Sequence, residues 1–253
     1  MRLATFNVLH GRSPVDGRVD LDRFAAAVAA LDADVLALQE VDLGQPRSHR
    51  ADLTQVAAAA MGAREHRFAA TLHGLPGAWW APVRPPRRWA YGIALLSRFP
   101  VDEWRVVALP RKAPVTWVPH AARWSDRLVR DEPRAALAAV VGSPLGQVTV
   151  VNTHVSFLRG WNTHQLELVL DGVRDMPRPL ALLGDLNMPP TLAASTTGMR
   201  ALATAPTYPV AAPARQIDHV LADGALRATA PARSVDTGLS DHRALVVDVT
   251  RDG

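Results

Sequence analysis

The side chains best suited to chemistry in this 253-residue chain are carboxylates, amides and imidazoles that lie beside short apolar runs. They belong to Asn7, Glu40, His154, Asp185, Asn187, Asp218, Asp241 and His242. Carboxylate and amide oxygens without thiolates form a hard ligand set that suits Mg²⁺ or Mn²⁺. Two histidines and a further carboxylate add groups for proton transfer. Together the residues indicate a hard-metal site with acid–base groups beside it.

Each of these residues has a plain structural explanation when it is taken alone. Asp185 and Asn187 could form a turn after a strand, because both residue types favour turns. A carboxylate such as Glu40 at the end of a buried run is costly unless it is paired, metal-bound or open to water. A single His154 is more often a hydrogen-bonded structural histidine. The chemical interpretation therefore depends on the whole set.

Short apolar runs that end in polar residues predict the buried β-strands that would position this set. Four of these runs cover residues 3–9, 34–40, 147–154 and 180–187. Two last strands are predicted at residues 217–221 and 244–249. Residues 91–96 and 104–109 predict a hairpin that turns at residues 98–100. Residues 110–133 lack periodicity and predict a surface excursion.

Helical patterns lie between the strands. Residues 21–31 carry apolar side chains at spacings of a helical face, with Asp20 as the predicted N-cap. Two further helices are predicted at residues 52–61, ending at Gly62, and at residues 166–173, with Asn162 as a cap.

The order strand–helix–strand occurs twice, which indicates a weak internal duplication of an α/β unit. The strands end at Asn7 and Glu40 in the first copy and at His154 and Asp185 in the second. Ligands of α/β sheets gather beyond the carboxyl ends of strands. We therefore expect these four side chains to meet at one cleft. No linker rich in Gly and Ser divides the chain, so residues 1–253 are predicted to form a single domain.

The motifs that contain these residues resemble, in their order, those of the endonuclease/exonuclease/phosphatase superfamily. Pancreatic deoxyribonuclease, AP endonucleases, bacterial sphingomyelinases and inositol-polyphosphate phosphatases belong to it. The motifs are T-F-N at 5–7, L-Q-E at 38–40, N-T-H at 152–154, G-D-L-N at 184–187, I-D-H at 217–219 and S-D-H-R at 240–243. Residues 91–98 resemble its central strand. The resemblance runs from Thr5 to His242 and leaves the subfamily unassigned.

The resemblance implies an α/β (α+β) fold, a four-layer sandwich of two mixed β-sheets packed face to face and flanked by helices. It implies a divalent metal, Mg²⁺ or Mn²⁺, held chiefly by Glu40 with Asn7 and Asp241 nearby. It also implies that Asp185 orients and activates the attacking water. Asn187 would bind a phosphate oxygen.

The same resemblance implies roles for the remaining polar residues. His242 would contact the phosphate and be held by Asp218. His154 matches a histidine of pancreatic deoxyribonuclease and sphingomyelinases, where AP endonucleases usually have tyrosine, and we expect it to protonate the leaving group. Arg134 resembles a family arginine near the scissile phosphate. R-W-S-D-R at 123–127 is similar to a 5-phosphatase signature, but it precedes the G-D-L-N motif, so we interpret it as a coincidence.

Composition narrows the class of protein. The 28 basic and 24 acidic side chains leave a formal net charge of +4, a mild excess that favours anionic partners. The absence of cysteine excludes disulfide scaffolds, thiolate zinc sites, iron–sulfur clusters and cysteine nucleophiles. No run approaches the roughly 18 apolar residues of a spanning helix. The first residues lack the pattern of a signal peptide, so we expect a cytoplasmic location.

These observations predict a divalent-metal-dependent phosphoesterase that hydrolyses a phosphodiester by in-line attack of an activated water. Nucleic acid is the preferred substrate. One alternative is a phosphoesterase that acts on a lipid, inositol or sugar-phosphate head group, as sphingomyelinases do. The other is a catalytically inactive binding module, against which the full set of site residues argues. We expect a monomer without an obligate protein partner.

The choice of substrate is predicted to depend on two segments rich in tryptophan and arginine. They lie at residues 76–91 and within the 110–133 excursion. Their tryptophans could pack the segments onto the domain, stack on bases or settle at a lipid interface. Contacts of Arg87, Arg88 and Arg127 with a phosphate backbone would weaken with salt.

Overall fold

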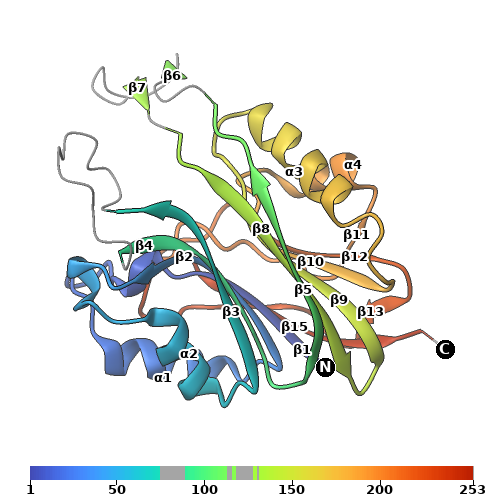
Figure 1. Ribbon diagram of the computed structural model, residues 1–253, viewed down its shortest axis with the longest axis horizontal. Helices are drawn as coiled ribbons and strands as arrows, with labels where there is room; N and C mark the ends of the chain where they lie inside the picture. Colours follow the sequence, from blue (N-terminus) through green and yellow to red (C-terminus); the bar gives the residue numbers. More distant parts are fainter. Residues whose placement is uncertain (75–88, 113–115, 118–127, 130, 253) are drawn as a thin grey trace.

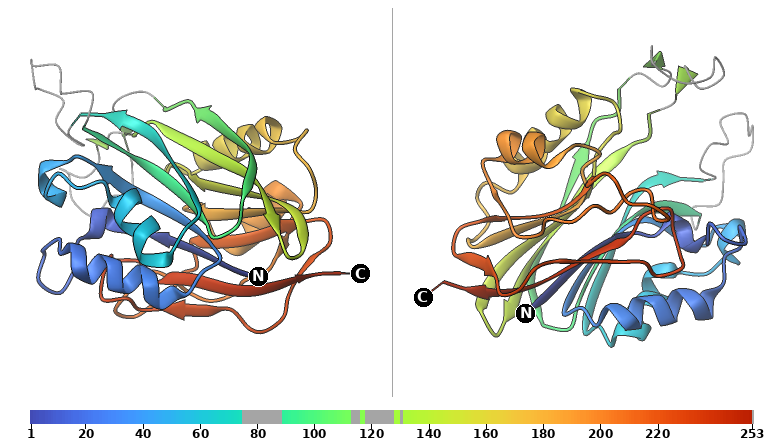
Figure 2. Two further views of the ribbon diagram at one scale, coloured as in Figure 1. Left: turned by 60° about the horizontal axis from the view of Figure 1, so that its bottom comes forward. Right: turned by 180° about the vertical axis from the view of Figure 1, so that it is seen from behind.

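A computed structural model describes residues 1–74, 89–112, 116–117, 128–129 and 131–252. Two mixed β-sheets pack face to face, and helices cover the outer surface of each sheet (Figures 1 and 2). This arrangement confirms the expected four-layer sandwich. The 123–127 motif and the side chains of Arg87, Arg88 and Arg127 lie outside the described residues, so the inferences drawn from them stay predictions.

The first sheet has the strand order β13-β15-β1-β2-β4-β3, and β14 pairs with β15. Its strands are β1 (Arg2–Asn7), β2 (Val35–Leu43), β3 (Glu65–His73), β4 (Ala90–Ser97), β13 (Leu226–Ala228), β14 (Arg233–Val235) and β15 (Ala244–Arg251). β1 and β2 are parallel, whereas their neighbours β15 and β4 run antiparallel to them. Helices α1 (Leu21–Leu31) and α2 (Leu53–Met61) cover this sheet (Figure 1).

The second sheet has the order β11-β12-β10-β9-β8-β5. Its strands are β5 (Val101–Leu109), β8 (Arg134–Ser143), β9 (Gly146–His154), β10 (Leu180–Asp185), β11 (Arg200–Ala201) and β12 (Asp218–Asp223). β9 and β10 are parallel, and the other pairs are antiparallel. Helices α3 (Trp161–Gly172) and α4 (Pro190–Thr197) cover it (Figure 1).

Smaller elements complete the described structure. Two 3-10 helices, η1 (Leu9–Gly11) and η2 (Pro46–Ser48), follow β1 and β2. Two short strands, β6 (Thr116–Trp117) and β7 (Leu128–Val129), pair within the predicted 110–133 excursion. In the part of the chain that the structure describes, no helix has the length and apolar character needed to cross a bilayer.

Three apolar cores hold the four layers together, and strand periodicity explains how they form. In β1, Leu3 faces the core between the sheets, whereas Ala4 and Phe6 pack under α1 and α2. In β10, Leu183 faces the core between the sheets and Leu182 packs under α3. Because successive side chains of a strand point to opposite faces, a fully apolar strand fits between two layers.

Most predicted elements are confirmed. The runs at 3–9, 34–40, 147–154 and 180–187 correspond to β1, β2, β9 and β10, and the last two strands correspond to β12 and β15. Asp20 caps α1, because its side chain accepts a hydrogen bond from the Arg23 N–H at 2.9 Å. Gly62 ends α2 in a left-handed conformation, as a helix-terminating glycine does.

Two predictions of local structure are wrong. Residues 91–96 and 104–109 do not form a hairpin, because β4 pairs with β2 and β3 while β5 pairs with β8 of the other sheet. The turn at 98–100 therefore joins the two sheets. Asn162 does not cap α3, which begins after Gly160. Its side chain instead donates a hydrogen bond to the Asn187 carbonyl at 3.0 Å.

A buried polar contact connects the two sheets beneath the strand ends. Gln39 of β2 donates a hydrogen bond to the Asn152 side chain of β9 at 2.7 Å. Asn152 in turn donates to the Leu38 and Ala94 carbonyls of the first sheet, at 2.9 and 2.8 Å. Because buried polar groups are costly to leave unpaired, these bonds favour one spacing of the sheets.

Candidate active site

The carboxyl ends of the two parallel strand pairs meet at one pocket, as the repeated strand–helix–strand order predicts. Asn7 of β1 joins the two halves across the sheets. Its Nδ2 donates hydrogen bonds to Glu40 Oε1 of β2 and to Asp185 Oδ2 of β10, both at 3.1 Å. Its Oδ1 accepts from the Leu9 N–H at 3.2 Å, which orients the amide. One buried asparagine thus holds two carboxylates around a common point.

Glu40 occupies an irregular position in β2. The register of β2 against β4 shifts between Leu38 and Val41, and Glu40 has a φ of 59°. A non-glycine residue in the left-handed region inside a bulge is unusual and clusters at functional sites. The bulge places the carboxylate beside Asn7.

The environment of Glu40 disfavours an isolated negative charge. Burial raises the pKa of its carboxyl, and Glu132 and Asp241 raise it further, while Asn7 and Arg134 act in the opposite direction. A cation bound among these carboxylates would relieve the same repulsion.

Asp185 and Asn187 follow β10 in a tight turn. Asp185 Oδ1 accepts a hydrogen bond from the Asn187 N–H at 3.0 Å, and Asn187 has a φ of 49°. The preceding Gly184, at φ 146°, lets β10 approach β9, because a Cβ atom there would lie 1.9 Å from the Thr153 carbonyl oxygen. Burial and Asp218 raise the pKa of the Asp185 carboxyl to about 7, against the opposing effects of His242 and Asn7.

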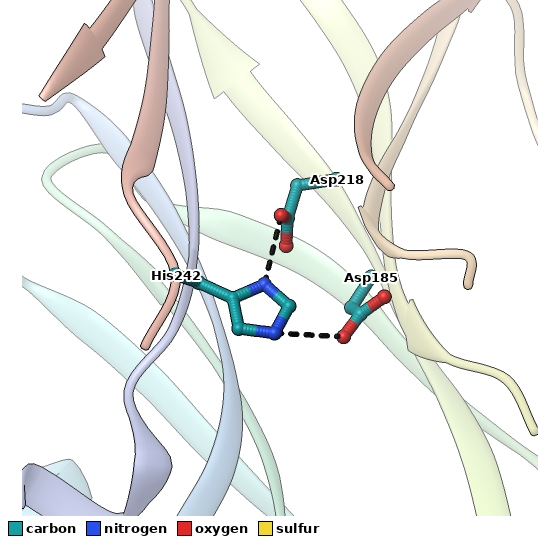
Figure 3. A group of neighbouring side chains, drawn as sticks. All are labelled: Asp185, Asp218 and His242. Carbon is teal, nitrogen blue, oxygen red and sulfur yellow. Dashed lines mark hydrogen bonds and ion pairs between the residues drawn. The ribbon is translucent and has the colours of Figure 1, made fainter. Parts of the chain in front are cut away.

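His242 and Asp218 form a buried pair, and the His242 ring lies between Asp218 and Asp185 (Figure 3). His242 Nδ1 donates to Asp218 Oδ2 at 2.9 Å, and Thr207 Oγ1 donates to the same oxygen at 2.5 Å. His242 Nε2 faces Asp185 Oδ2 at 3.8 Å. Burial lowers the pKa of His242, but the bond to Asp218 and the charges of the nearby aspartates outweigh it and raise the pKa to about 9. The imidazole is therefore a cation at neutral pH.

His154 lies in a different environment from His242. Its Nδ1 lies 2.9 Å from Arg134 Nη1, and since a guanidinium only donates, Nδ1 is the acceptor. The hydrogen of the neutral ring is then on Nε2, which lies 3.5 Å from Asp185 Oδ2 and 3.4 Å from Asn187 Nδ2. Burial, and then Arg134 and His242, lower the pKa of His154 well below its ordinary value. His154 is thus a neutral hydrogen-bond donor at the site.

Asp241 reaches the pocket because the preceding serine fixes the loop. Ser240 Oγ donates to the Asn7 carbonyl at 2.6 Å and accepts from the His242 N–H at 3.1 Å. Ser240 has a φ of 62° and its N–H donates to the Arg12 carbonyl. The S-D-H motif is thereby tied to the end of β1, and both Asp241 and His242 line the pocket.

All eight polar residues from the sequence analysis lie at or directly behind this pocket, which has a volume of about 440 Å³. Glu40, His154, Asp185, Asn187, Asp241, His242 and Arg134 line it. Asn7 and Asp218 lie behind it, in contact with Glu40, Asp185 and His242. Polar side chains from segments far apart in the sequence meet at this pocket, so it is the candidate active site.

Sequence reasoning missed several residues that line the same pocket. They are Leu9, His10, Arg47, Tyr91, Glu132, Phe157, Tyr208, Arg215 and Ile217. Glu132 and Ile217 could have been found as neighbours of Arg134 and Asp218, and Tyr91 begins the 91–98 motif. Arg47, Tyr208 and Arg215 come from loops whose sequences carry no such signal. The Arg215 guanidinium lies over the Tyr208 ring, 4.8 Å from its centroid.

Two groups of side chains at or directly behind the pocket could hold a metal ion. Ligand atoms of Asp185, Asp218 and His242 lie within 4.8 Å of one another. Hydrogen bonds already occupy Asp218 Oδ2 in this group. The second group is Glu40 with Asp241, whose oxygens accept fewer hydrogen bonds from the described residues. Its hard oxygens and mutual repulsion fit a divalent cation.

Comparisons with known proteins identify the family and the fold. The model of the endonuclease/exonuclease/phosphatase family matches residues 4–242. No curated protein matches the chain. Among solved structures, an endonuclease/exonuclease/phosphatase from Beutenbergia cavernae is 28% identical with a TM-score of 0.74, covering 100% of this chain and 72% of its own.

Two more distant structures share the fold. The human Nocturnin catalytic domain is 17% identical, with a TM-score of 0.63 and coverage of 100% of this chain and 94% of its own. A mannosyl-6-phosphatase from Bacteroides thetaiotaomicron is 15% identical, with a TM-score of 0.65 and coverage of 99% of both chains. The family match spans nearly the whole chain, and it includes every residue of the candidate site. The chain belongs to the endonuclease/exonuclease/phosphatase family, whose members are phosphoric-ester hydrolases.

Proposed function

We propose that this chain is a divalent-metal-dependent phosphodiesterase that acts by in-line attack of an activated water, with nucleic acid as its preferred substrate. The observation that carries the proposal is the bridge made by Asn7. Its amide joins Glu40 of the first sheet to Asp185 of the second, at 3.1 Å each. A cation site and a water-activating carboxylate would thereby flank one phosphate.

Glu40, with Asn7 and Asp241 nearby, would hold Mg²⁺ or Mn²⁺. When bound, the ion would stabilise the negative charge that develops on the phosphoryl oxygens. The donor set supports this assignment, because Glu40 lies among carboxylates that raise its pKa and has one hydrogen-bond donor, Asn7, among the described side chains. A cation there would also hold Glu40 in its charged form.

Asp185 would orient the attacking water and accept its proton. Its pKa of about 7 supports this role, because a general base works best when its pKa lies near the operating pH. His242, kept cationic by Asp218, would pair with a phosphoryl oxygen. Asn187 would supply a further contact from its side-chain amide. Arg134, which lines the pocket and lies 2.9 Å from His154 Nδ1, would lie near the same phosphate.

For His154 the geometry supports a role other than the expected protonation of the leaving group. Burial and Arg134 oppose the charged form, so a proton on Nδ1 is unfavourable. The neutral ring can still donate its Nε2–H to a phosphoryl oxygen. We therefore propose that His154 stabilises charge in the transition state by a hydrogen bond.

His154→Ala is expected to lower kcat/KM by about 10²-fold, the usual effect of removing one such donor. The loss should be similar for bis(p-nitrophenyl) phosphate, which has a good leaving group, and for a dinucleotide, which has a poor one. Steady-state kinetics on both substrates measure the ratio. His164→Ala, on an exposed part of α3, is the matched control. A much larger loss on the dinucleotide would restore leaving-group protonation as the role of His154.

The test of the proposed function is hydrolysis of a substrate panel by the purified chain, with Mg²⁺ or with EDTA. The panel contains plasmid DNA, RNA, bis(p-nitrophenyl) phosphate, inositol phosphates and sphingomyelin. We expect turnover of the generic diester and of nucleic acid that disappears in EDTA and returns with Mg²⁺ or Mn²⁺. Hydrolysis of the inositol phosphates or sphingomyelin alone would contradict the nucleic-acid assignment. Activity undiminished by EDTA would contradict the metal-dependent mechanism.

A further inference from the structure

A second pocket, of about 570 Å³, adjoins the candidate active site. His10 and Arg47 line both pockets, so the two are continuous along one wall. The second pocket is also lined by Arg12, Arg18 and His49. None of the described residues that line it is acidic. The pocket is therefore an electropositive extension of the site, and neither the proposed metal ligands nor the water-activating group lies in it.

A short closed loop places two of its arginines together. Residues 12–19 form a turn closed by an antiparallel bridge between Arg12 and Val19. The Ser13 N–H donates to the Arg18 carbonyl and the Gly17 N–H donates to the Ser13 carbonyl, both at 2.9 Å. Arg12 Nε donates to the Gly17 carbonyl at 3.2 Å. The hydrogen-bonded loop thus places the exposed side chains of Arg12 and Arg18 close together in the chain.

The acidic residue of this loop does not neutralise them. Asp16 instead accepts hydrogen bonds from Arg23 Nη1 at 3.0 Å and from the backbone N–H of Arg18 at 2.9 Å. Within the described ranges, no carboxylate lies within 4.0 Å of the guanidinium of Arg12 or Arg18. Both positive charges remain available to an anion.

Arg47 is held rigidly where the two pockets meet. Asp42, which is fully buried, accepts from Nε and Nη2 of Arg47 at 2.8 Å each. The guanidinium also lies over the Tyr91 ring, 5.5 Å from its centroid. Nη1 donates to none of the described residues. A guanidinium that is fixed along one edge can donate its remaining N–H groups to an oxyanion without further ordering.

The imidazole between these arginines adds a neutral polar group. Burial, and then Arg47 and Arg12, lower the pKa of His10 to about 4, so the ring is uncharged at neutral pH. Arg12 and Arg47 both line this pocket, so a phosphate bound in it would have two guanidiniums among its neighbours.

We infer that this pocket binds a second phosphate of the substrate, so that the preferred substrate carries another phosphate next to the scissile one. Successive phosphates of a nucleic-acid strand meet this requirement. The inference rests on the proposed function, since it takes the scissile phosphate to lie beside Glu40 and Asp185. Arg12, Arg18 and Arg47 would then determine part of the substrate preference.

The test compares inhibitors that differ by one phosphate. Hydrolysis of bis(p-nitrophenyl) phosphate is measured in excess Mg²⁺ with thymidine 5′-phosphate or thymidine 3′,5′-bisphosphate. The bisphosphate should inhibit at a concentration lower by about tenfold or more, as expected for one added charge-assisted contact. The double variant Arg12→Ala/Arg18→Ala should lose this difference, with its hydrolysis of the reporter changed less than twofold. Arg64→Ala/Arg67→Ala, which removes two exposed arginines of another surface, should keep it.

These outcomes distinguish a failure of the second-phosphate inference from a failure of the proposed function. Equal inhibition by the two thymidine compounds, together with equal inhibition by inositol 1-phosphate and inositol 1,4-bisphosphate, would overturn the inference. A difference that survives Arg12→Ala/Arg18→Ala would overturn it too. An arginine-dependent difference in the inositol pair alone would support the second-phosphate pocket and assign it to a sugar-phosphate head group. If the reporter is not hydrolysed, the proposed function fails, and calorimetric titration of the same four compounds still tests the pocket.

Discussion

Asp185→Asn is expected to lower kcat by about 10³-fold, because it removes the group that accepts the proton of the attacking water. The substituted side chain has the same shape. Its Oδ1 can still accept the Asn187 N–H, which lies 3.0 Å from the carboxylate in the native protein. The new amide NH2 group would face the Asn7 Nδ2 donor, 3.1 Å from the native carboxylate oxygen, so circular dichroism is used to check that the fold is kept. Single-turnover kinetics with saturating Mg²⁺ measure the chemical step directly.

The matched control for this substitution is Asp223→Asn. Asp223 lies at the opposite end of the β10–β12 pair, opposite Leu180, and its carboxylate accepts a hydrogen bond from Arg178 at the surface. The same chemical change there should leave kcat within about twofold, as expected for a surface position distant from the site. If Asp185→Asn keeps more than a tenth of the native kcat, Asp185 is not the general base.

Glu40→Gln is expected to weaken Mn²⁺ binding by about tenfold or more and to raise the Mg²⁺ concentration for half-maximal activity by a similar factor. The amide keeps an oxygen for the Asn7 Nδ2–H, now 3.1 Å from Glu40 Oε1, so the local structure should persist. The change removes one negative charge from the ligand set. Calorimetry with Mn²⁺ measures binding without reference to turnover.

Glu103→Gln on the exposed part of β5 is the control, since it removes an equal charge from a surface ion pair with Arg105. It should leave Mn²⁺ affinity unchanged. Unaltered Mn²⁺ affinity in Glu40→Gln would contradict the assignment of Glu40 as a metal ligand. The group of Asp185, Asp218 and His242 would then be the candidate, and Asp218→Asn should weaken the binding.

Local signals in the sequence explain why so much of the fold could be predicted. Asp20 and Gly62 bound helices through hydrogen bonds and a left-handed terminus that involve only adjacent residues. β1, β2, β9 and β10 are apolar on both faces, so the composition of each strand already indicates a layer on each side. Strand β8 is as apolar as these, yet its alanine-rich sequence gives a weak strand signal, and no strand was predicted there.

Pairing between strands could not be predicted in the same way. β4 and β5 are adjacent in the chain and both suit a strand, which is why a hairpin was expected. Their backbones instead bond to different sheets, because β4 is buried on both faces whereas β5 exposes several residues at an edge. Which partner a strand takes depends on the packing of the whole molecule.

The residue types of the candidate site could be predicted because each stands in or directly after a short apolar run. A carboxylate or imidazole directly after an apolar strand is a local feature, so Asn7, Glu40, His154 and Asp185 could be named without coordinates. The fold was needed to show that Arg47 lines two pockets and that His154 and His242 have pKa values shifted in opposite directions. The reason is physical: burial and the charges of neighbouring groups set a pKa, and those neighbours come from distant parts of the chain.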